Sequence, residues 1–166
     1  MGIPGASGST VQTAATAIKC ESTGTSVYYG GTANLSAGSG VGEIVTFGTE
    51  DGSEVLVAGR LFYLNASGVW KYADANAEIS TKSLMGIALG TAVSDGLLVK
   101  GYFNMSTYLD GSHVKGSPCF VSANATKGQI TFTAPTAAGD YVRVLGYGTD
   151  TANVIWFSPS GDWIEL

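Results

Sequence analysis

Side chains that could do catalytic chemistry form no recognisable catalytic set in this sequence. The one histidine, His113, lies in the polar run DGSHVKG, with Asp110 and Lys115 close to it along the chain. Adding a serine would complete a His–Asp–Ser set, but no G-x-S-x-G turn and no cysteine beside a base marks a nucleophile. We therefore expect His113 to be a solvated loop side chain or a subunit contact, and we expect no catalytic residue.

Acidic residues and cysteines form no recognisable metal or cofactor pattern. Glu50 and Asp51 precede Gly52 and could help to bind calcium, although acidic residues before glycine are ordinary in turns. Cys20 and Cys119 lack metal-ligand spacing and are too few for a disulfide framework, so we expect both to be buried and reduced. The thirteen acidic residues do not select a glycosidase pair, and no glycine-rich run has the spacing of a phosphate loop. The sequence predicts no cofactor and no metal site.

The charge balance argues against several kinds of partner. Thirteen acidic residues against eight basic ones give a net charge of −5, and the basic residues form no cluster. This balance disfavours nucleic acids and anionic membranes as partners. No apolar run approaches the roughly 20 residues of a membrane-spanning helix. Because the first residues have neither the charged nor the apolar region of a secretory signal, we expect synthesis in a cytoplasm.

The N-terminal residues have the composition of an extended arm. Residues 1–19 are rich in Gly, Ser and Thr, lack aromatic side chains and carry a single charge, on Lys19. A segment with so little apolar surface does not fold on itself, so we expect it to run along another subunit by main-chain pairing. Its expected contact residues are Ile3, Pro4, Val11, Thr13 and Ile18. Residues 20–40 are predicted to form a Gly/Ser/Thr-rich connecting segment.

From residue 41 onward the pattern is typical of an all-β domain, which we expect to span 41–166 as a single antiparallel β-barrel or sandwich. Short apolar runs alternate with Gly, Asn, Asp and Ser. In YVRVLGY, Val142 and Val144 are expected to face the interior and Arg143 the solvent. Residues 74–83 could form a helical turn, and 105–116 are predicted to form a loop. The predicted strands are 43–48, 54–58, 60–65, 69–73, 84–90, 96–103, 118–122, 128–134, 141–147, 153–158 and 162–165.

The same four-strand pattern occurs twice. GRLFYLNASGVWKYA, from Gly59, parallels GSPCFVSANATKGQITFTA, from Gly116, and SLMGIALG parallels VRVLGYG. We therefore predict an internal duplication with halves at about 58–103 and 115–158. Chance similarity between two β-hairpins is the alternative. Three glycine pairs align in this comparison: Gly59 with Gly116, Gly68 with Gly128, and Gly86 with Gly146.

Tryptophan and tyrosine side chains could form a sugar-binding platform, but strand packing explains most of them. Trp70 and Trp156 lie inside alternating strands, where aromatic side chains pack. Trp163 lies in the terminal GDWIEL, and chain ends are exposed unless they are docked. We expect Trp163, Ile164 and Leu166 to form a subunit contact.

Residues 57–166 resemble a known group of structural proteins. The strings AGRLFYLNASGVWKYADANAEISTKSLMGIALGT, DGLLVKGYF, GSPCFVSANATKGQITFTAPTAAGDYVRVLGYG and WFSPSGDWIEL resemble structural proteins of tailed bacteriophage particles, including small head decoration (capsid cement) proteins. The same strings are also similar to regions of phage tail fibres. The shared motifs are the G-x-x-strand-turn-G hairpin, the LMGIALG and VRVLGYG strands and the terminal aromatic segment, and they include no catalytic residue.

The resemblance implies a non-enzymatic, β-rich virion protein made in the host cytoplasm. A decoration protein on the outer surface of the phage head is favoured, because 166 residues are few for a whole fibre. The implied partners are the major capsid protein and further copies of the chain, as a homotrimer. The resemblance leaves open an alternative, a tail-fibre or receptor-binding protein that recognises host surface glycans.

Overall fold

The computed structural model describes residues 19–20 and 27–28 by their backbone and residues 35–166 in full. The predicted arm contacts Ile3, Pro4, Val11, Thr13 and Ile18 lie outside the described residues, as does the side chain of Cys20. Within the described part, no helix is long and apolar enough to cross a membrane.

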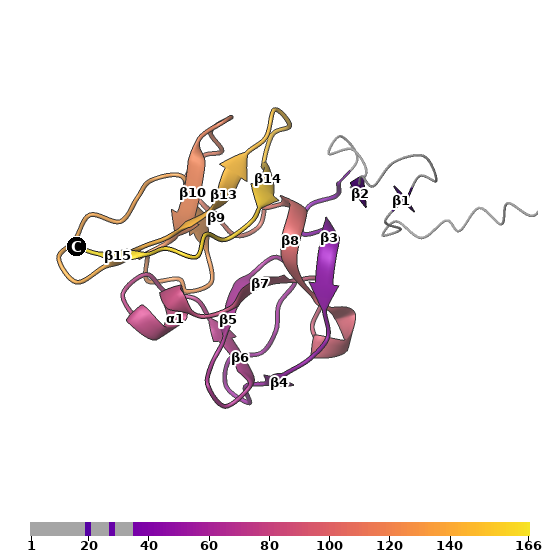
Figure 1. The fold of residues 1–166 in the computed structure, drawn as a ribbon, viewed down its shortest axis with the longest axis horizontal. Coiled ribbons are helices and arrows are strands. Elements are labelled where there is room, and N and C mark those ends of the chain that lie inside the picture. The colour runs from indigo at the N-terminus through magenta and orange to yellow at the C-terminus, as the bar shows by residue number, and fades with distance from the viewer. Residues whose placement is uncertain (1–18, 21–26, 29–34) are drawn as a thin grey trace, which may run out of the picture.

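The described chain is built from short strands (Figure 1). Its helical segments are α1, of five residues, and the 3-10 turn η2, of three, so the predicted all-β class is confirmed. The elements are β1 (Lys19–Cys20), β2 (Val27–Tyr28), β3 (Gly40–Val45), β4 (Thr49–Glu50), β5 (Leu61–Leu64), β6 (Val69–Tyr72), α1 (Glu78–Lys82), β7 (Met85–Ala88), η2 (Val93–Asp95), β8 (Leu97–Asn104), β9 (Leu109–Asp110), β10 (Pro118–Val121), β11 (Ile130–Thr131), β12 (Tyr141–Val142), β13 (Val144–Gly148), β14 (Val154–Phe157) and β15 (Ile164–Glu165).

Most strands belong to one sheet of eleven, in the order β4-β6-β5-β7-β8-β14-β13-β10-β11-β9, with β3 also paired to β8. The sheet ends at β4 and β9 and does not close, so the fold is sandwich-like and the barrel alternative is wrong. It is also mixed, because β4 runs parallel to β6 and β9 runs parallel to β11. These two parallel pairs depart from the predicted antiparallel sheet; the other pairs of the sheet are antiparallel.

The two halves of the chain have the same strand order, which confirms the predicted duplication. Starting from its outer edge, the first repeat (β4–β8) is ordered β4-β6-β5-β7-β8, and the second (β9–β14) is ordered β9-β11-β10-β13-β14. Their registers also agree. Phe62 pairs with Gly86 as Cys119 pairs with Gly146, so the glycines aligned by sequence are structurally equivalent.

The repeats begin earlier than predicted. β4 and β9 occupy equivalent edge positions, and the motif DGS-x-V follows the start of each, from Asp51 and from Asp110. The turn before each central strand matches as well, because the Arg60 amide donates to the Val57 carbonyl as the Ser117 amide donates to the Val114 carbonyl. The recurrence of DGS-x-V in the sequence would have allowed the predicted repeats to start earlier, near Asp51 and Asp110.

The hairpin glycines Gly68 and Gly128 have φ values of 75° and 74°, as predicted for equivalent turns. Alanine at either position would strain the backbone, so Gly68→Ala is expected to lower the free energy of unfolding by about 1 kcal/mol. Gly128→Ala should cost more, because its Cβ would lie 3.1 Å from the Leu61 carbonyl oxygen. Urea denaturation measures both. Gly52→Ala, which has open space and no positive φ, is the control and should change stability little; an equal loss there would contradict the argument.

Two hydrophobic clusters fill the part of the fold that the structure describes. The larger one draws on both repeats, and the smaller one lies on the other face of the first repeat. The larger cluster contains Leu61, Tyr63, Ala73, Ala75, Met85, Ile87, Leu98, Phe103, Met105, Cys119, Val121, Ile130, Leu145, Ile155 and Phe157. The smaller contains Leu56, Phe62, Trp70, Ala88, Val93 and Leu97.

Strand β8 turns over where the two repeats join. Leu98 and Phe103 are five residues apart, so a regular strand would place them on opposite faces, yet both lie in the larger cluster. The register with β3 shifts between Glu43, which pairs with Lys100, and Ile44, which pairs with Leu98, so Val99 is the extra residue. The irregularity reverses the faces of the strand, as a bulge does.

Because of this reversal, the repeats turn opposite faces toward the larger cluster. Phe62 lies in the smaller cluster, whereas its counterpart Cys119 lies in the larger one. The sheet order is therefore duplicated, but the packing is not.

Several predicted strands differ in the structure. Residues 54–58 form no strand; they cross the smaller cluster and bury Leu56. Only Ile130 and Thr131 pair within the predicted strand 128–134, and the predicted loop 105–116 contains β9. The predicted strand 141–147 is interrupted at Arg143, between β12 and β13.

Candidate partner-binding surface

The C-terminal residues continue past β14 along the edge of β13 and β12. The Ser158 amide donates to the Leu145 carbonyl at 2.8 Å, and the Ser160 amide donates to the Val144 carbonyl at 2.9 Å. The chain then continues in the same direction as β15, in which Ile164 pairs with Val142. Pro159 and Gly161 lie in the interruption between β14 and β15, where regular pairing is lost.

Arg143 anchors this segment. Its side chain is buried, with 8% exposed, which contradicts the prediction that it faces solvent. Its Nε donates to the Ser160 carbonyl at 2.8 Å, and its Nη1 donates to the Thr81 and Ser83 carbonyls at 2.6 and 2.7 Å. Burial lowers the pKa of Arg143. The guanidinium thus joins the C-terminal segment to the end of α1 through backbone carbonyls.

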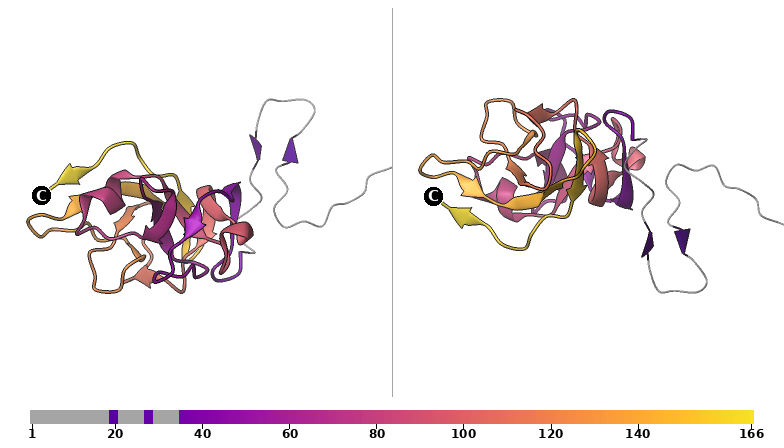
Figure 2. Two further views of the ribbon diagram at one scale, coloured as in Figure 1. Left: turned by 90° about the horizontal axis from the view of Figure 1, so that it is seen from below. Right: turned by 90° about the horizontal axis from the view of Figure 1, so that it is seen from above.

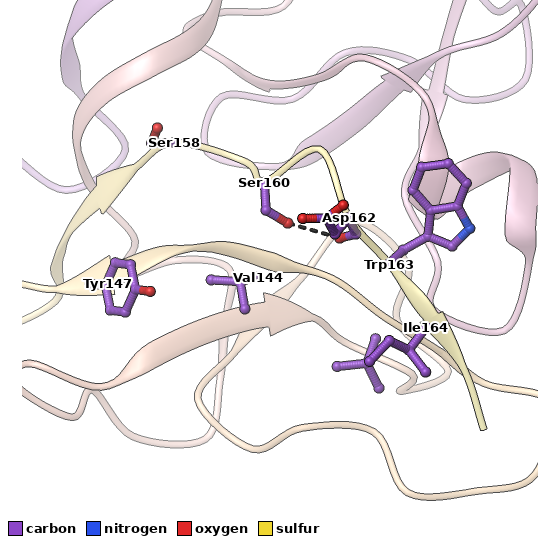
Figure 3. A pocket seen from close by; sticks show the side chains of 8 residues that line it. Val144, Tyr147, Ser158, Ser160, Asp162, Trp163 and Ile164 are labelled. Carbon is purple, nitrogen blue, oxygen red and sulfur yellow. Dashed lines mark hydrogen bonds between the residues drawn. The ribbon is translucent and has the colours of Figure 1, made fainter.

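An open groove of about 390 Å³ lies beside this anchor (Figure 3). Figure 3 shows Tyr147 and Trp163 toward opposite ends of it, with Val144, Ser160 and Asp162 between them. Tyr147 is 51% exposed, Trp163 40% and Ile164 65%, and Leu166, beyond β15, is 47% exposed. We call this the C-terminal groove; it is lined by Val142, Val144, Tyr147, Ser158, Ser160, Asp162, Trp163 and Ile164.

The groove face of the second repeat corresponds to a buried face of the first. By the register of the central strands, Val144 is the counterpart of Met85, and Tyr147 is the counterpart of Ile87. Met85 and Ile87 are 1% and 0% exposed in the larger cluster, whereas Tyr147 is half exposed. The second repeat therefore leaves open, at Tyr147, part of a face that the first repeat buries, while Phe120, the counterpart of Tyr63, stays buried.

Charge is sparse along this groove. Asp162 is the one ionisable carboxylate among the lining residues. In the neighbouring strand β12, burial raises the pKa of the Tyr141 hydroxyl. The nearby carboxylates of Glu165 and Glu78 raise this pKa further. The groove itself presents mainly apolar side chains and serine hydroxyls, which suits contact with an uncharged partner.

The sequence located part of this surface. Trp163 and Ile164 line the groove and Leu166 is exposed beside it, so the structure brings the predicted C-terminal contact residues together. Whether they contact a partner stays a prediction. The sequence analysis did not select Tyr147 or Arg143, because it assigned the apolar Val142 and Val144 to the interior. In the structure Val142 and Val144 are half-buried at the groove.

The other residues considered for chemistry have structural contacts. The His113 ring packs edge-on against Phe132, with centroids 5.2 Å apart, and its Nε2 lies 3.2 Å from the Val154 carbonyl oxygen. It is therefore partly buried rather than freely solvated. Cys119 is buried and free, as predicted, and burial raises its pKa to about 12.

The acidic pair Glu50 and Asp51 is engaged within the chain. Glu50 accepts a hydrogen bond from the Val93 amide at 3.1 Å. Lys71 lies 2.7 Å from the Asp51 carboxylate and, together with hydrogen bonds from Ser53, holds the pKa of Asp51 well below its usual range. Over the residues that the structure describes, no three His, Cys, Asp or Glu side chains are grouped as metal ligands.

The strand tryptophans differ from each other. Trp70 is fully buried, and its Nε1 donates to the Phe47 carbonyl at 2.8 Å, as expected of a packed indole. Trp156 is only half-buried and packs edge-on against Tyr102, with centroids 4.9 Å apart. Neither lines the C-terminal groove.

Comparison of the chain with models of protein families, with curated proteins and with solved structures gave no match. The C-terminal groove, the all-β fold and the sequence resemblance are therefore the grounds for a functional proposal.

Proposed function

We propose that this protein is a non-enzymatic structural protein of a tailed-bacteriophage particle. It binds the outside of the assembled head as a decoration protein and stabilises the shell by bridging its subunits. The resemblance of residues 57–166 to such proteins supports the proposal. The observation that carries it is the C-terminal groove, where the second repeat leaves open part of a face that the first repeat buries.

Exposed apolar side chains of this size favour burial against another protein. Full burial of a large apolar side chain contributes roughly 1.5–3 kcal/mol, and aromatic residues are enriched where proteins meet. Because Arg143 and β12 hold the C-terminal segment, little ordering is needed when a partner binds.

A decoration protein needs no turnover, only many contacts. Each copy that touches two neighbours raises the work of separating them, and many weak contacts add up across a shell. In this proposal the partners are the major capsid protein and further copies of the chain, arranged as a homotrimer. Synthesis takes place in the host cytoplasm, and assembly onto the head follows.

Binding to heads tests the proposal. Heads of the parent phage, prepared without this protein, are mixed with the purified chain and sedimented. The wild-type chain should sediment with them, and a Trp163→Asp/Ile164→Asp double variant should bind at least about 30-fold more weakly, because it loses about 2 kcal/mol of apolar burial. Val55→Asp, at a side chain that is 58% exposed outside the groove, is the matched control and should bind normally.

Two results would contradict the proposal: failure of the wild-type chain to bind heads, or an equal loss in the Val55→Asp control. Recognition of host glycans by a tail protein is the second candidate. It is favoured by one observation, that the aromatic rings of Tyr147 and Trp163 flank the hydroxyl of Ser160 and the carboxylate of Asp162. Binding to a glycan array that Trp163→Ala abolishes, without binding to heads, would support this candidate instead.

A further inference from the structure

Strand β15 has an open outer edge. Leu166 directs both of its backbone groups toward the β12 side: its amide donates to the Asp140 carbonyl at 3.0 Å, and its carbonyl accepts from the Gly139 amide at 2.8 Å. Alternation along an antiparallel strand then turns the backbone N–H and C=O of Glu165 outward. β12 and β15 form a two-stranded sheet, and no other strand of the described chain lies on the outer side of β15. An edge of this kind accepts an added strand.

The open edge adjoins an apolar groove whose counterpart is already covered by β-structure. In the first repeat, the equivalent face packs against strands of the second repeat in the larger cluster. In the second repeat, the C-terminal segment covers this face only in part and leaves Tyr147 51% exposed. A further strand laid along β15 would extend this cover.

The chain itself contains a segment with suitable chemistry. Residues 1–18 include no charged side chain, so their burial beside the groove requires no ion to be desolvated. Within them, VQTAATAI (11–18) contains β-branched residues and alternates Val11, Thr13, Ala15 and Ala17 with a second row. This composition suits a strand that places small apolar groups over Tyr147 and Trp163.

We propose that residues 11–18 of one copy add as a strand to the outer edge of β15 in a second copy and cover its C-terminal groove. This inference rests on the proposed function for its biological setting. The partner that it specifies is a second copy of the same chain. Each chain has a net charge of −5, so two copies repel each other when they approach. A contact through the uncharged arm keeps the two β-domains separated and so reduces this electrostatic repulsion.

A second copy is a better occupant than the same chain. The fully described body begins at Leu35, whose carbonyl accepts a hydrogen bond from Asn104 at the end of β8. β8 and β15 lie toward opposite ends of the body in Figure 1, and the views in Figure 2 agree. The described body is therefore entered near β8, and the C-terminal groove of the same copy lies toward its other end, whereas the groove of a neighbouring copy can lie beside the arm.

Photocrosslinking of the full chain tests the arrangement. The photoreactive residue p-benzoylphenylalanine replaces Val11 in an unlabelled chain, which is mixed with ¹⁵N-labelled wild-type chain and irradiated. We expect crosslinks from position 11 to peptides that contain Tyr147 or Trp163, with the two peptides carrying different isotope labels. The same probe at Val55 is the control and should not reach these peptides.

Two matched variants in the labelled chain test the strand edge. Glu165→Pro removes the outward N–H of Glu165 without touching the bonds of Leu166, and it should lower the crosslink yield at least about tenfold. Glu165→Gln retains the N–H and should leave the yield unchanged. Crosslinks within one chain only, crosslinks to another surface, or a yield unaffected by Glu165→Pro would each overturn the inference.

This experiment is independent of phage heads. If position 11 fails to crosslink while Trp163→Asp/Ile164→Asp still weakens head binding, the shell protein itself occupies the groove, and the inference fails without the proposed function. If the crosslinks form but the chain does not bind heads, the proposed function fails and the self-association stands.

Discussion

Replacing Arg143 by methionine is expected to lower the free energy of unfolding by about 2–4 kcal/mol. Methionine keeps an unbranched apolar chain but removes the donors that serve the carbonyls of Thr81, Ser83 and Ser160. A hydrogen bond to a charged group contributes roughly 1.5–3 kcal/mol, and a buried acceptor left without a donor adds its desolvation cost. Relief from burying the guanidinium offsets part of this loss.

Urea denaturation measures this loss, and limited proteolysis locates it. Arg143→Met should speed cleavage within residues 158–166, because Ser160 is no longer held. Arg143→Lys keeps the charge but cannot span three carbonyls, so its stability should fall between wild type and Arg143→Met. Lys115→Met, at an exposed loop position, is the matched control and should change stability by less than about 0.5 kcal/mol. An Arg143→Met variant as stable as that control would contradict the anchoring role.

Replacing Trp70 by alanine is expected to lower the free energy of unfolding by about 3–5 kcal/mol. Trp70 is fully buried in the smaller cluster, so its removal leaves a cavity between β6 and residues 47–57. It also removes the Nε1 hydrogen bond to the Phe47 carbonyl and the ring contact with Phe47, whose centroid lies 6.3 Å away. The segment that crosses this cluster should therefore loosen together with the core.

Two further variants show how much of the loss in Trp70→Ala comes from the Nε1 hydrogen bond and how much from the buried position of the ring. Trp70→Phe retains an aromatic ring but not the Nε1 donor, and it should cost roughly 1–3 kcal/mol. Trp163→Ala removes an indole that is 40% exposed, and without a partner it should cost much less than Trp70→Ala. Denaturation with urea gives all three values. Equal losses for Trp70→Ala and Trp163→Ala would show that the smaller cluster contributes little to stability.

The duplicated halves have diverged according to what each one covers. Trp70 and its counterpart Ile130 are both buried, but they lie in different clusters because the faces of β8 reverse between Leu98 and Lys100. The first repeat needs a large aromatic residue where residues 47–57 lie over it, whereas Ile130 packs between the repeats. The second repeat is left with an open face, and this asymmetry creates the C-terminal groove.

The sequence by itself determined the fold class, most strands and the duplication. These features depend on local physics: alternation with period two marks strands, and glycine marks turns that require a positive φ, as at Gly68 and Gly128. The strands that were missed or wrong, such as 54–58 and β9, are short segments whose conformation depends on what they cross. Trp163, Ile164 and Leu166, which the sequence analysis selected as contact residues, are exposed in the structure.

Only the tertiary structure decided which face of each strand is buried. Alternation around Arg143 states that two faces differ, but not which one meets the interior. The burial of Arg143 depends on the carbonyls of Thr81 and Ser83, about sixty residues earlier in the chain. The exposure of Tyr147 likewise follows from the reversal within β8, which turned the equivalent face of the first repeat inward. Contacts between distant segments set these outcomes, and a local pattern does not encode them.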